Sequence, residues 1–321
     1  MVRARLAILT PVRTAPTTRH KIAKPANRYV RFATKDQGLT DQSNVEFSIE
    51  TVFGRKLRVA RWRWNVESEH LPVLFFNGIG TNIEAVSDLA EALDDRPFMI
   101  FDMPGVGLSP EPLVPYNTVM MSLTARELLR RFNCEQADVM GVSWGGALAQ
   151  QFALQHSDCV RRLVLCATSA GMVPHPSNLR AILRLGKAGR IADAGFLSRN
   201  FASIYARVAD RRKELTAHLM PPTLRGFGYQ LLAMWGWTSL PALPLLAHET
   251  LIMMGEEDEI VPLANGRILA AMIPRSRLEV FAGGGHLFML THSEQTVSSL
   301  RAFLDEPERK SAYCPPSRKA A

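Results

Sequence analysis

Cysteines and long apolar runs are both scarce in this sequence, and each absence excludes a class of protein. The four cysteines follow neither the spacing of a zinc site nor that of a disulfide framework. No apolar run approaches the ~20 residues that a membrane-spanning helix needs, and the run at 6–10 is too short for a signal-peptide core. We therefore expect a cytoplasmic protein with reduced thiols and no transmembrane segment.

Acidic residues are absent from the first 35 positions, which contain nine arginines and lysines. Since the whole chain carries a formal net charge of +8, the rest of it is close to neutral. This composition predicts that residues 1–44 form a basic, disordered extension, either a solvated tail or an arm that touches an anionic surface such as a lipid- or protein-coated granule. No nucleic-acid-binding motif accompanies it, so nucleic acid is not the expected partner.

Regular apolar patterns begin at Val45 and continue to the end of the core. Alternation at 45–53 and 56–64 predicts an antiparallel hairpin, with Trp62 and Trp64 on one face. Continuous apolar runs predict buried strands, and amphipathic segments between them predict helices. The expected strands are 72–76, 97–101, 137–140, 161–167, 250–254 and 277–281, and the expected helices are 82–93, 118–132, 147–153 and 293–305.

This alternation predicts an α/β fold, with a mostly parallel central sheet and helices on both faces. Residues 171–247 interrupt the alternation, because they contain helix formers and proline breaks but no comparable strand. We therefore expect a core formed by 45–170 and 248–306, with an inserted helical cap at 171–247 and a tail at 307–321.

The most informative motif is Gly-Val-Ser-Trp-Gly at 141–145, between an expected strand and an expected helix. A tight turn there would hold Ser143 in a strained conformation with its hydroxyl exposed, which is the setting of a catalytic nucleophile. Glycine is required at 141 and 145, because a Cβ would collide with the neighbouring strand and helix. The alternative is a glycine-rich turn with an incidental serine.

A serine hydroxyl is a weak nucleophile and needs a general base that a carboxylate orients. His286 follows the last expected strand in a glycine-rich loop, a setting that the other seven histidines lack. Asp258 follows the strand at 250–254, so it should lie at the same edge of the sheet. The neighbouring glutamates are competing candidates, and the cluster could also be a solvated acidic loop; they are Glu256, Glu257 and Glu259.

Acyl transfer also needs hydrogen-bond donors for the developing oxyanion. The expected donors are the backbone N–H groups of Trp144 and of Ile79, which lies in a loop with two glycines at 77–82. A third glycine-rich loop at 102–109 lacks the spacing of a dinucleotide site and is expected to be a structural turn. This chemistry requires no metal and no organic cofactor.

Taken together, these residues resemble the α/β-hydrolase superfamily over about 45–306. Four stretches are similar to the intracellular depolymerases of medium-chain-length polyhydroxyalkanoates: 76–80, 101–107, the run GVSWGGALAQQF at 141–152, and 236–239. The resemblance implies hydrolysis of a 3-hydroxyacyl polyester at the surface of storage granules, with Ser143, Asp258 and His286 as the catalytic triad. The chain departs from that pattern in its basic extension and in three glycines at 283–285, which predict a looser loop before His286.

Aromatic and methionine side chains in the expected cap suit an irregular apolar substrate. The candidates for substrate contact are Phe227, Met234, Trp235 and Trp237, and the alternative is that they pack the cap onto the core. Two other functions remain open: a small-molecule carboxylesterase, lipase or carbon–carbon bond hydrolase with the same triad, and a non-catalytic binding protein on the same scaffold. Chain-length preference and oligomeric state stay undetermined.

Overall fold

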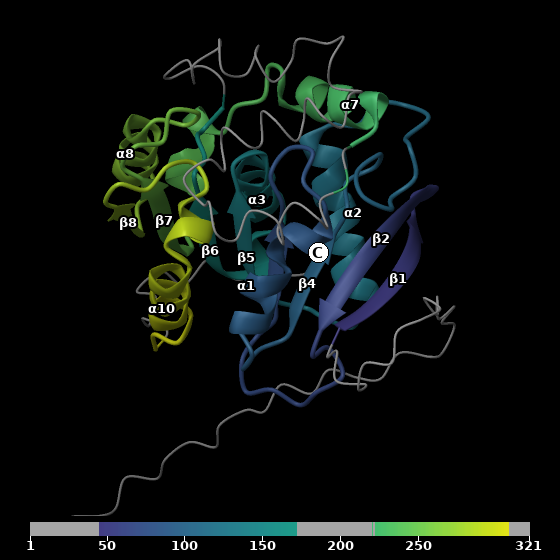
Figure 1. The fold of residues 1–321 in the computed structure, drawn as a ribbon, viewed down its shortest axis with the longest axis horizontal. Coiled ribbons are helices and arrows are strands. Elements are labelled where there is room, and N and C mark those ends of the chain that lie inside the picture. The colour runs from purple at the N-terminus through teal and green to yellow at the C-terminus, as the bar shows by residue number, and fades with distance from the viewer. Residues whose placement is uncertain (1–44, 172–219, 221, 308–321) are drawn as a thin grey trace, which may run out of the picture.

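The central feature is one eight-stranded sheet with the strand order β1-β2-β4-β3-β5-β6-β7-β8. The computed structural model describes residues 45–171, 220 and 222–307 (Figure 1). β1 and β2 are antiparallel to each other, β2 is antiparallel to β4, and all later pairings are parallel. The strands are β1 Val45–Val52, β2 Arg55–Trp62, β3 Val73–Phe76, β4 Phe98–Phe101, β5 Ala137–Val142, β6 Val160–Cys166, β7 Glu249–Gly255 and β8 Ser276–Phe281.

Helices cover both faces of this sheet (Figure 1). One face packs against α1 (Ser87–Ala92) and α10 (Ser293–Leu304), and the other against α2 (Thr118–Arg131), α3 (Trp144–Gln155) and α8 (Leu263–Met272). Each face has its own apolar cluster because successive side chains of a buried strand point to opposite sides. The shorter elements are α7 Leu224–Met234, α9 Phe288–Thr291, and the 3₁₀ turns Ile83–Val86, Ser157–Cys159 and Leu240–Leu245. The architecture confirms the predicted fold class.

The first hairpin forms where the alternating pattern predicts it, and its two-residue turn is Phe53 and Gly54, both with positive φ. The expectation that Trp62 and Trp64 share a face is wrong. Trp62 stacks edge-on against Phe98 in one apolar cluster, while Trp64 lies in the other. β2 ends at Trp62, and the φ of 51° at Arg63 reverses the alternation before Trp64.

Two helical segments differ from their predictions. The helix expected at 82–93 begins as a 3₁₀ turn, Ile83–Val86, and becomes α1 only at Ser87. The apolar pattern gave no helix between β7 and β8, where the structure has α8. Gly266 in α8 lies against β7, and a Cβ there would come 2.4 Å from the Met254 side chain, so close packing rather than helix propensity decides this residue.

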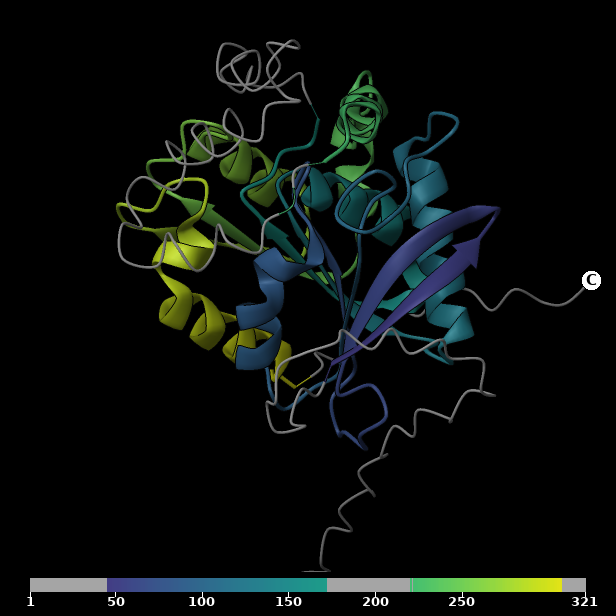
Figure 2. The same ribbon diagram turned by 45° about the vertical axis from the view of Figure 1, so that its right-hand side comes forward.

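α7 lies across the carboxyl edge of the sheet, above the loops that follow β3 and β4 (Figures 1 and 2). Thr223 caps this helix by accepting a hydrogen bond from the Gly226 N–H, and its own N–H donates to the Gly105 carbonyl at 2.7 Å. Gly226 and Gly105 touch so closely that a Cβ on either would collide with the other. The remaining part of the expected cap (172–219 and 221), the basic extension at 1–44 and residues 308–321 lie outside the described residues. Among the described helices, none is long and apolar enough to cross a membrane.

Candidate active site

Ser143 occupies the turn between β5 and α3, with φ 54° and ψ −116°. A non-glycine residue in this region carries about 1–3 kcal/mol of strain, so surrounding contacts must hold it there. Its N–H donates to the Cys166 carbonyl at 2.8 Å, and its own carbonyl accepts the Thr168 hydroxyl at 2.7 Å. The residue is partly exposed. The structure therefore places the predicted nucleophile on a strained, supported turn at the carboxyl edge of the sheet.

The glycines of the motif are required by close backbone contacts. A Cβ on Gly141 would lie 2.2 Å from the Gly145 carbonyl oxygen, and one on Gly145 would lie 2.0 Å from the Phe76 carbonyl oxygen. A Cβ on Gly146 would lie 2.5 Å from the Thr168 side chain. Because these glycines lack a Cβ, the start of α3 packs directly against β3 and β5. The collisions that a Cβ would cause are those expected from the sequence.

Replacing Gly145 with alanine is expected to destabilise the protein by at least ~3 kcal/mol, because the Cβ would meet backbone that cannot move independently of β3. The matched control is Gly228→Ala in α7, where no atom lies within 4 Å of the new Cβ and alanine gains about 1 kcal/mol of helix propensity. Urea unfolding midpoints of both variants check this. Equal midpoints for the two would contradict the close-packing explanation.

Asp258 and His286 form a hydrogen-bonded pair, with 2.8 Å between the Asp258 Oδ2 and the His286 Nδ1. The Asp258 side chain is fully buried, and its other oxygen accepts the backbone N–H groups of Ile260 and Val261, both at 2.8 Å. With both oxygens engaged, the carboxylate is fixed in orientation. The structure thus brings together the predicted acid and base, and it selects Asp258, the buried member of the acidic cluster, as the partner of His286; Glu256, Glu257 and Glu259 are exposed.

The loops that present this pair are bonded directly to each other. The Glu257 N–H donates to the Gly284 carbonyl at 2.8 Å, and a Cβ on Gly255 would lie 2.4 Å from the carbonyl oxygens of Gly284 and Gly285. Stacking of Phe281 on Phe288, with ring centroids 4.3 Å apart, closes the base of the loop. Gly255 therefore allows the two loops to approach each other. Of the three glycines before His286, Gly284 is tightly packed, since a Cβ there would lie 3.0 Å from the Phe281 carbonyl oxygen and from the Phe288 Cβ, whereas a Cβ on Gly283 would meet nothing within 4 Å.

The loop after β3 lies beside the nucleophile, since a Cβ on Gly78 would be 3.9 Å from the Ser143 Cβ. The N–H groups of Gly78, Gly80 and Thr81 each donate to an acceptor within the protein. Among the described residues, no acceptor is bonded to the N–H of Ile79. The N–H of Trp144 is in the first turn of α3, where N–H groups lack partners within the helix and the helix dipole favours negative charge. Both predicted donors are therefore available for a ligand.

Asp102 ties the third glycine-rich loop to the segment that follows the loop after β3. Its carboxylate accepts the N–H of Ile83 at 2.8 Å and that of Leu108 at 3.3 Å, and Arg58 lies 3.5 Å away. Burial raises the pKa of Asp102 to about 7 in spite of the Arg58 charge. A Cβ on Gly107 would collide with this carboxylate at 2.3 Å, which agrees with the structural turn that the sequence predicts.

The four predicted substrate-contact residues have different surroundings. Phe227 is buried against the loop after β3, with a ring atom 3.2 Å from where a Gly80 Cβ would lie. The Trp237 indole donates to Gln151 in α3 at 3.0 Å, and Met234 packs partly buried against the core. Trp235 is 74% exposed. Their contact with a substrate stays a prediction.

A polar residue that the sequence analysis did not single out, Gln230, joins α7 to this site. Its side-chain oxygen accepts the Gly80 N–H at 2.8 Å, and its main-chain carbonyl accepts the Trp144 indole N–H at 2.9 Å. The available signal was a lone amide on the buried face of α7, three residues from Phe227 and from Ala233. A polar side chain in the middle of an apolar helix face usually has a partner, since an unpaired one is costly to bury.

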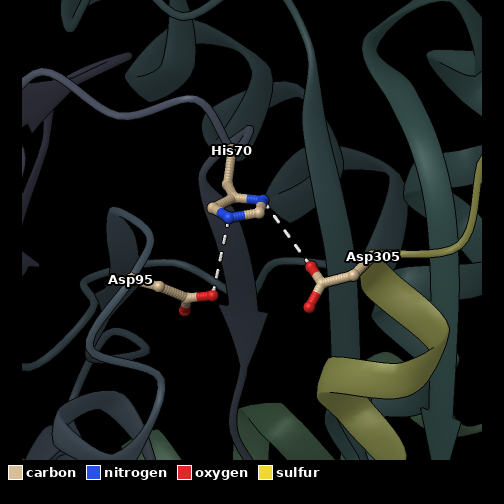
Figure 3. Close-up of side chains that lie close together, drawn as sticks. All are labelled: His70, Asp95 and Asp305. Atoms are coloured by element: carbon tan, nitrogen blue, oxygen red, sulfur yellow. Dashed lines mark ion pairs between the residues drawn. The ribbon is translucent and has the colours of Figure 1, made fainter.

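The opposite edge of the sheet carries a cluster of His70, Asp95 and Asp305, with each carboxylate 3.6 Å from an imidazole nitrogen (Figure 3). Their ligand atoms lie within 4.8 Å of one another, a spacing that could hold a metal ion. Arg96 bonds both carboxylates at 2.7 Å, however, and Arg301 lies 3.1 Å from Asp95. Burial raises the pKa of Asp95, but the hydrogen bond and charge of Arg96 outweigh it and keep that pKa below its ordinary value. Two guanidinium groups disfavour a further cation, so this is an ion-pair network that fastens the end of α10.

Comparison with known proteins assigns the fold to one family. Residues 73–299 match the family described as alpha/beta hydrolases. The chain belongs to the alpha/beta hydrolase family. This alpha/beta hydrolase is 35% identical over 249 residues to a poly(3-hydroxyalkanoate) depolymerase of Ectopseudomonas oleovorans, covering 76% of the chain and 88% of the relative.

A second relative of this alpha/beta hydrolase is a 2-hydroxymuconate semialdehyde hydrolase of Pseudomonas sp. strain CF600, 29% identical over 276 residues, which is 79% of the chain and 95% of the relative. Among solved structures, a hydrolase from Pseudomonas aeruginosa PA01 superposes with a TM-score of 0.70 at 22% identity, over 83% of this chain and all of that one. The likeness to that structure concerns the fold alone. The chain is thus a hydrolase by family, and the resemblance predicted from its motifs is confirmed.

Proposed function

We propose that the protein is a serine hydrolase that cleaves carboxylic esters through an acyl-enzyme, with Ser143 as nucleophile, His286 as general base and Asp258 as the carboxylate that orients it. The observation that carries the proposal is the hydrogen bond between buried Asp258 and partly buried His286 at the same sheet edge as the strained Ser143 turn. An imidazole held by a fixed carboxylate presents its Nε2 as a proton acceptor. Without a base oriented in this way, the Ser143 hydroxyl would remain a weak nucleophile.

In the proposed reaction, the Ser143 Oγ attacks the ester carbonyl carbon while the His286 Nε2 takes the hydroxyl proton. The N–H groups of Ile79 and Trp144 donate to the oxyanion of the tetrahedral intermediate, and removing one such donor typically costs about 10²–10³ in rate. The carbon–oxygen bond then breaks, and His286 gives its proton to the leaving alkoxide. Water attacks the acyl-enzyme with His286 again as base, which releases the acid and restores Ser143. No step requires a metal or an organic cofactor.

The proposed substrate is a medium-chain-length 3-hydroxyacyl polyester or its oligomers. The depolymerase relative supports this choice, since the similarity extends over most of both chains. Apolar side chains of α7 beside the oxyanion loop also suit an alkyl-substituted ester; Phe227 and Met234 lie on this helix. A second candidate is carbon–carbon bond hydrolysis with the same triad, which the 2-hydroxymuconate semialdehyde hydrolase relative favours.

A substrate series would separate these candidates. We expect release of 3-hydroxy acids from an emulsified medium-chain polyester, and turnover of soluble nitrophenyl esters that rises from acetyl to octanoyl. The Ser143→Ala variant gives the background for both assays. Turnover of short soluble esters alone would sink the polyester proposal, and preferential turnover of a 2-hydroxymuconate semialdehyde would favour the second candidate. A protein with none of these activities would be the non-catalytic binder.

We further propose that residues 171–247 form a cap over the site and that the protein works in the cytoplasm at polyester granules. The nine basic residues in the first 35 positions support an arm that attaches to an anionic granule surface. In the same substrate series, the chain without residues 1–44 should keep its soluble-ester turnover and lose activity on the polymer. Loss of both would show that the arm belongs to the catalytic fold.

A further inference from the structure

We infer that Gln230 is a positioning residue that holds the two halves of the oxyanion site in register from the cap side. This inference rests on the proposed serine mechanism, in which Ile79 and Trp144 supply the oxyanion donors. The supporting feature is a juxtaposition: one residue of α7 is bonded to the loop that carries the first donor and to the side chain of the residue that carries the second. Gln230 is fully buried, so both bonds are shielded from water.

The bond to Gly80 fixes the loop immediately after Ile79. Gly80 has a φ of 66°, which turns its N–H toward α7, where the Gln230 Oε1 accepts it at 2.8 Å. The same glycine packs against the residues around the start of α7, since a Cβ there would lie 3.1 Å from Pro222 and 3.2 Å from Phe227. Engaging this N–H leaves the preceding peptide N–H, that of Ile79, for a ligand. Without the Gln230 acceptor, the peptide could rotate and misdirect the neighbouring donor.

The second hydrogen bond fixes Trp144, the residue that carries the other proposed oxyanion donor. The Trp144 indole is buried, and it donates to the Gln230 carbonyl at 2.9 Å. The residue begins α3, so its indole and its backbone N–H move together with the turn that holds Ser143. α7 therefore contacts both sides of the proposed oxyanion site, through one hydrogen bond to Gly80 and one to Trp144.

The Gln230 amide also contains a hydrogen-bond donor, Nε2, whose burial is costly. Its Nε2 is buried and bonds no acceptor among the described residues. A leucine or methionine of similar size would remove that unpaired donor, but it would leave the buried Gly80 N–H without its acceptor. The acceptor for the Gly80 N–H is therefore what the amide contributes.

Gln230→Met tests this role, with Gln151→Met as the matched control. Gln151 also joins the cap to the core, since it accepts the Trp237 indole N–H at 3.0 Å, but it does not touch the oxyanion loop. For Gln230→Met we expect kcat on a nitrophenyl ester to fall about 10- to 100-fold with KM within about twofold, as for a misplaced transition-state donor. For Gln151→Met we expect kcat within about twofold of the parent.

Inhibitors distinguish positioning from a general loss of structure. An alkylboronic acid forms a tetrahedral adduct on Ser143, and its inhibition constant should rise by the same factor as kcat falls in Gln230→Met. The inhibition constant of a 3-hydroxy acid product should not change. Equal losses in the two methionine variants, or equal weakening of both inhibitors, would overturn the inference.

Gln230→Glu provides a second test if the methionine variant does not fold. It keeps an acceptor for the Gly80 N–H, but an ionised carboxylate beside the oxyanion would oppose the transition state. Its kcat relative to the parent should therefore fall as pH rises, and a constant ratio at all pH values would contradict the proposed position. A serine-reactive phosphonate separates failure of this inference from failure of the proposed function, because an unlabelled parent protein would reject the serine mechanism itself.

Discussion

Replacing Ser143 with alanine is expected to lower kcat on a soluble nitrophenyl ester by about 10⁴- to 10⁶-fold. The loss follows because the Oγ forms the acyl bond, and water would have to take its place without the covalent intermediate. The residual rate would come from the donors of Ile79 and Trp144 and from substrate binding. Steady-state kinetics measure the loss, and a phosphonate probe should label the parent protein and not the variant.

The control for this prediction is Ser157→Ala. Ser157 also has a histidine partner, with 3.1 Å between its Oγ and the His248 Nε2, but the pair lies before β6 and β7, at the opposite edge of the sheet from Ser143. Its alanine variant should keep the full rate. If Ser143→Ala retains a tenth of the parent rate, or if Ser157→Ala loses activity, the nucleophile has been misassigned.

The Asp258→Asn variant should lose about 10⁴-fold in kcat with little change in fold. The backbone donors of Ile260 and Val261 would hold the oxygen of the new amide, as they now hold the Asp258 Oδ1. The amide nitrogen would then face the His286 Nδ1 in place of the Oδ2. Because that nitrogen only donates, His286 would carry its proton on Nε2 and could not accept the proton of Ser143.

Glu259→Gln is the matched control for the acid, since Glu259 is the next residue and is exposed. It should leave kcat within about twofold, as expected for a surface carboxylate. Near-parent activity of Asp258→Asn, together with a large loss in Glu259→Gln, would move the acid to the neighbouring residue. Near-ultraviolet circular dichroism of the variants checks that the fold is unchanged.

Local apolar patterns predicted most of the sheet because buried parallel strands leave a signal within a few residues. β3, β4 and β7 each lie within one residue of the expected runs, and the hairpin turn at Phe53 and Gly54 lies within one residue of the break between the two alternating segments. α8 was missed because its sequence contains Asn265 and Gly266, and the fit of Gly266 depends on packing against β7. The placement of Trp64 was wrong because one backbone angle at Arg63 decided it.

The candidate site also contains residues that the sequence identified and contacts that only the structure revealed. Ser143, Asp258 and His286 were identifiable because each follows a predicted strand, and the carboxyl ends of parallel strands share one edge. The partners of Gln230 were not identifiable, because they are 86 and 150 residues away in the sequence and no local pattern records such contacts. The close approach of Gly255 to the loop before His286 could also be found only once both loops were seen together.

The sequence by itself determined the alternation of strands and helices, the α/β fold class and the residue types able to perform acyl transfer, since each depends on the order of side chains along a short segment. The tertiary structure alone decided which carboxylate of the acidic cluster bonds His286 and which N–H groups around Ser143 have no acceptor among the described residues. It also decided how α7 is hydrogen-bonded to Gly80 and Trp144. Those outcomes depend on hydrogen-bond distances between segments that are remote in the chain, and such distances are set only when the sheet brings the loops to a common edge.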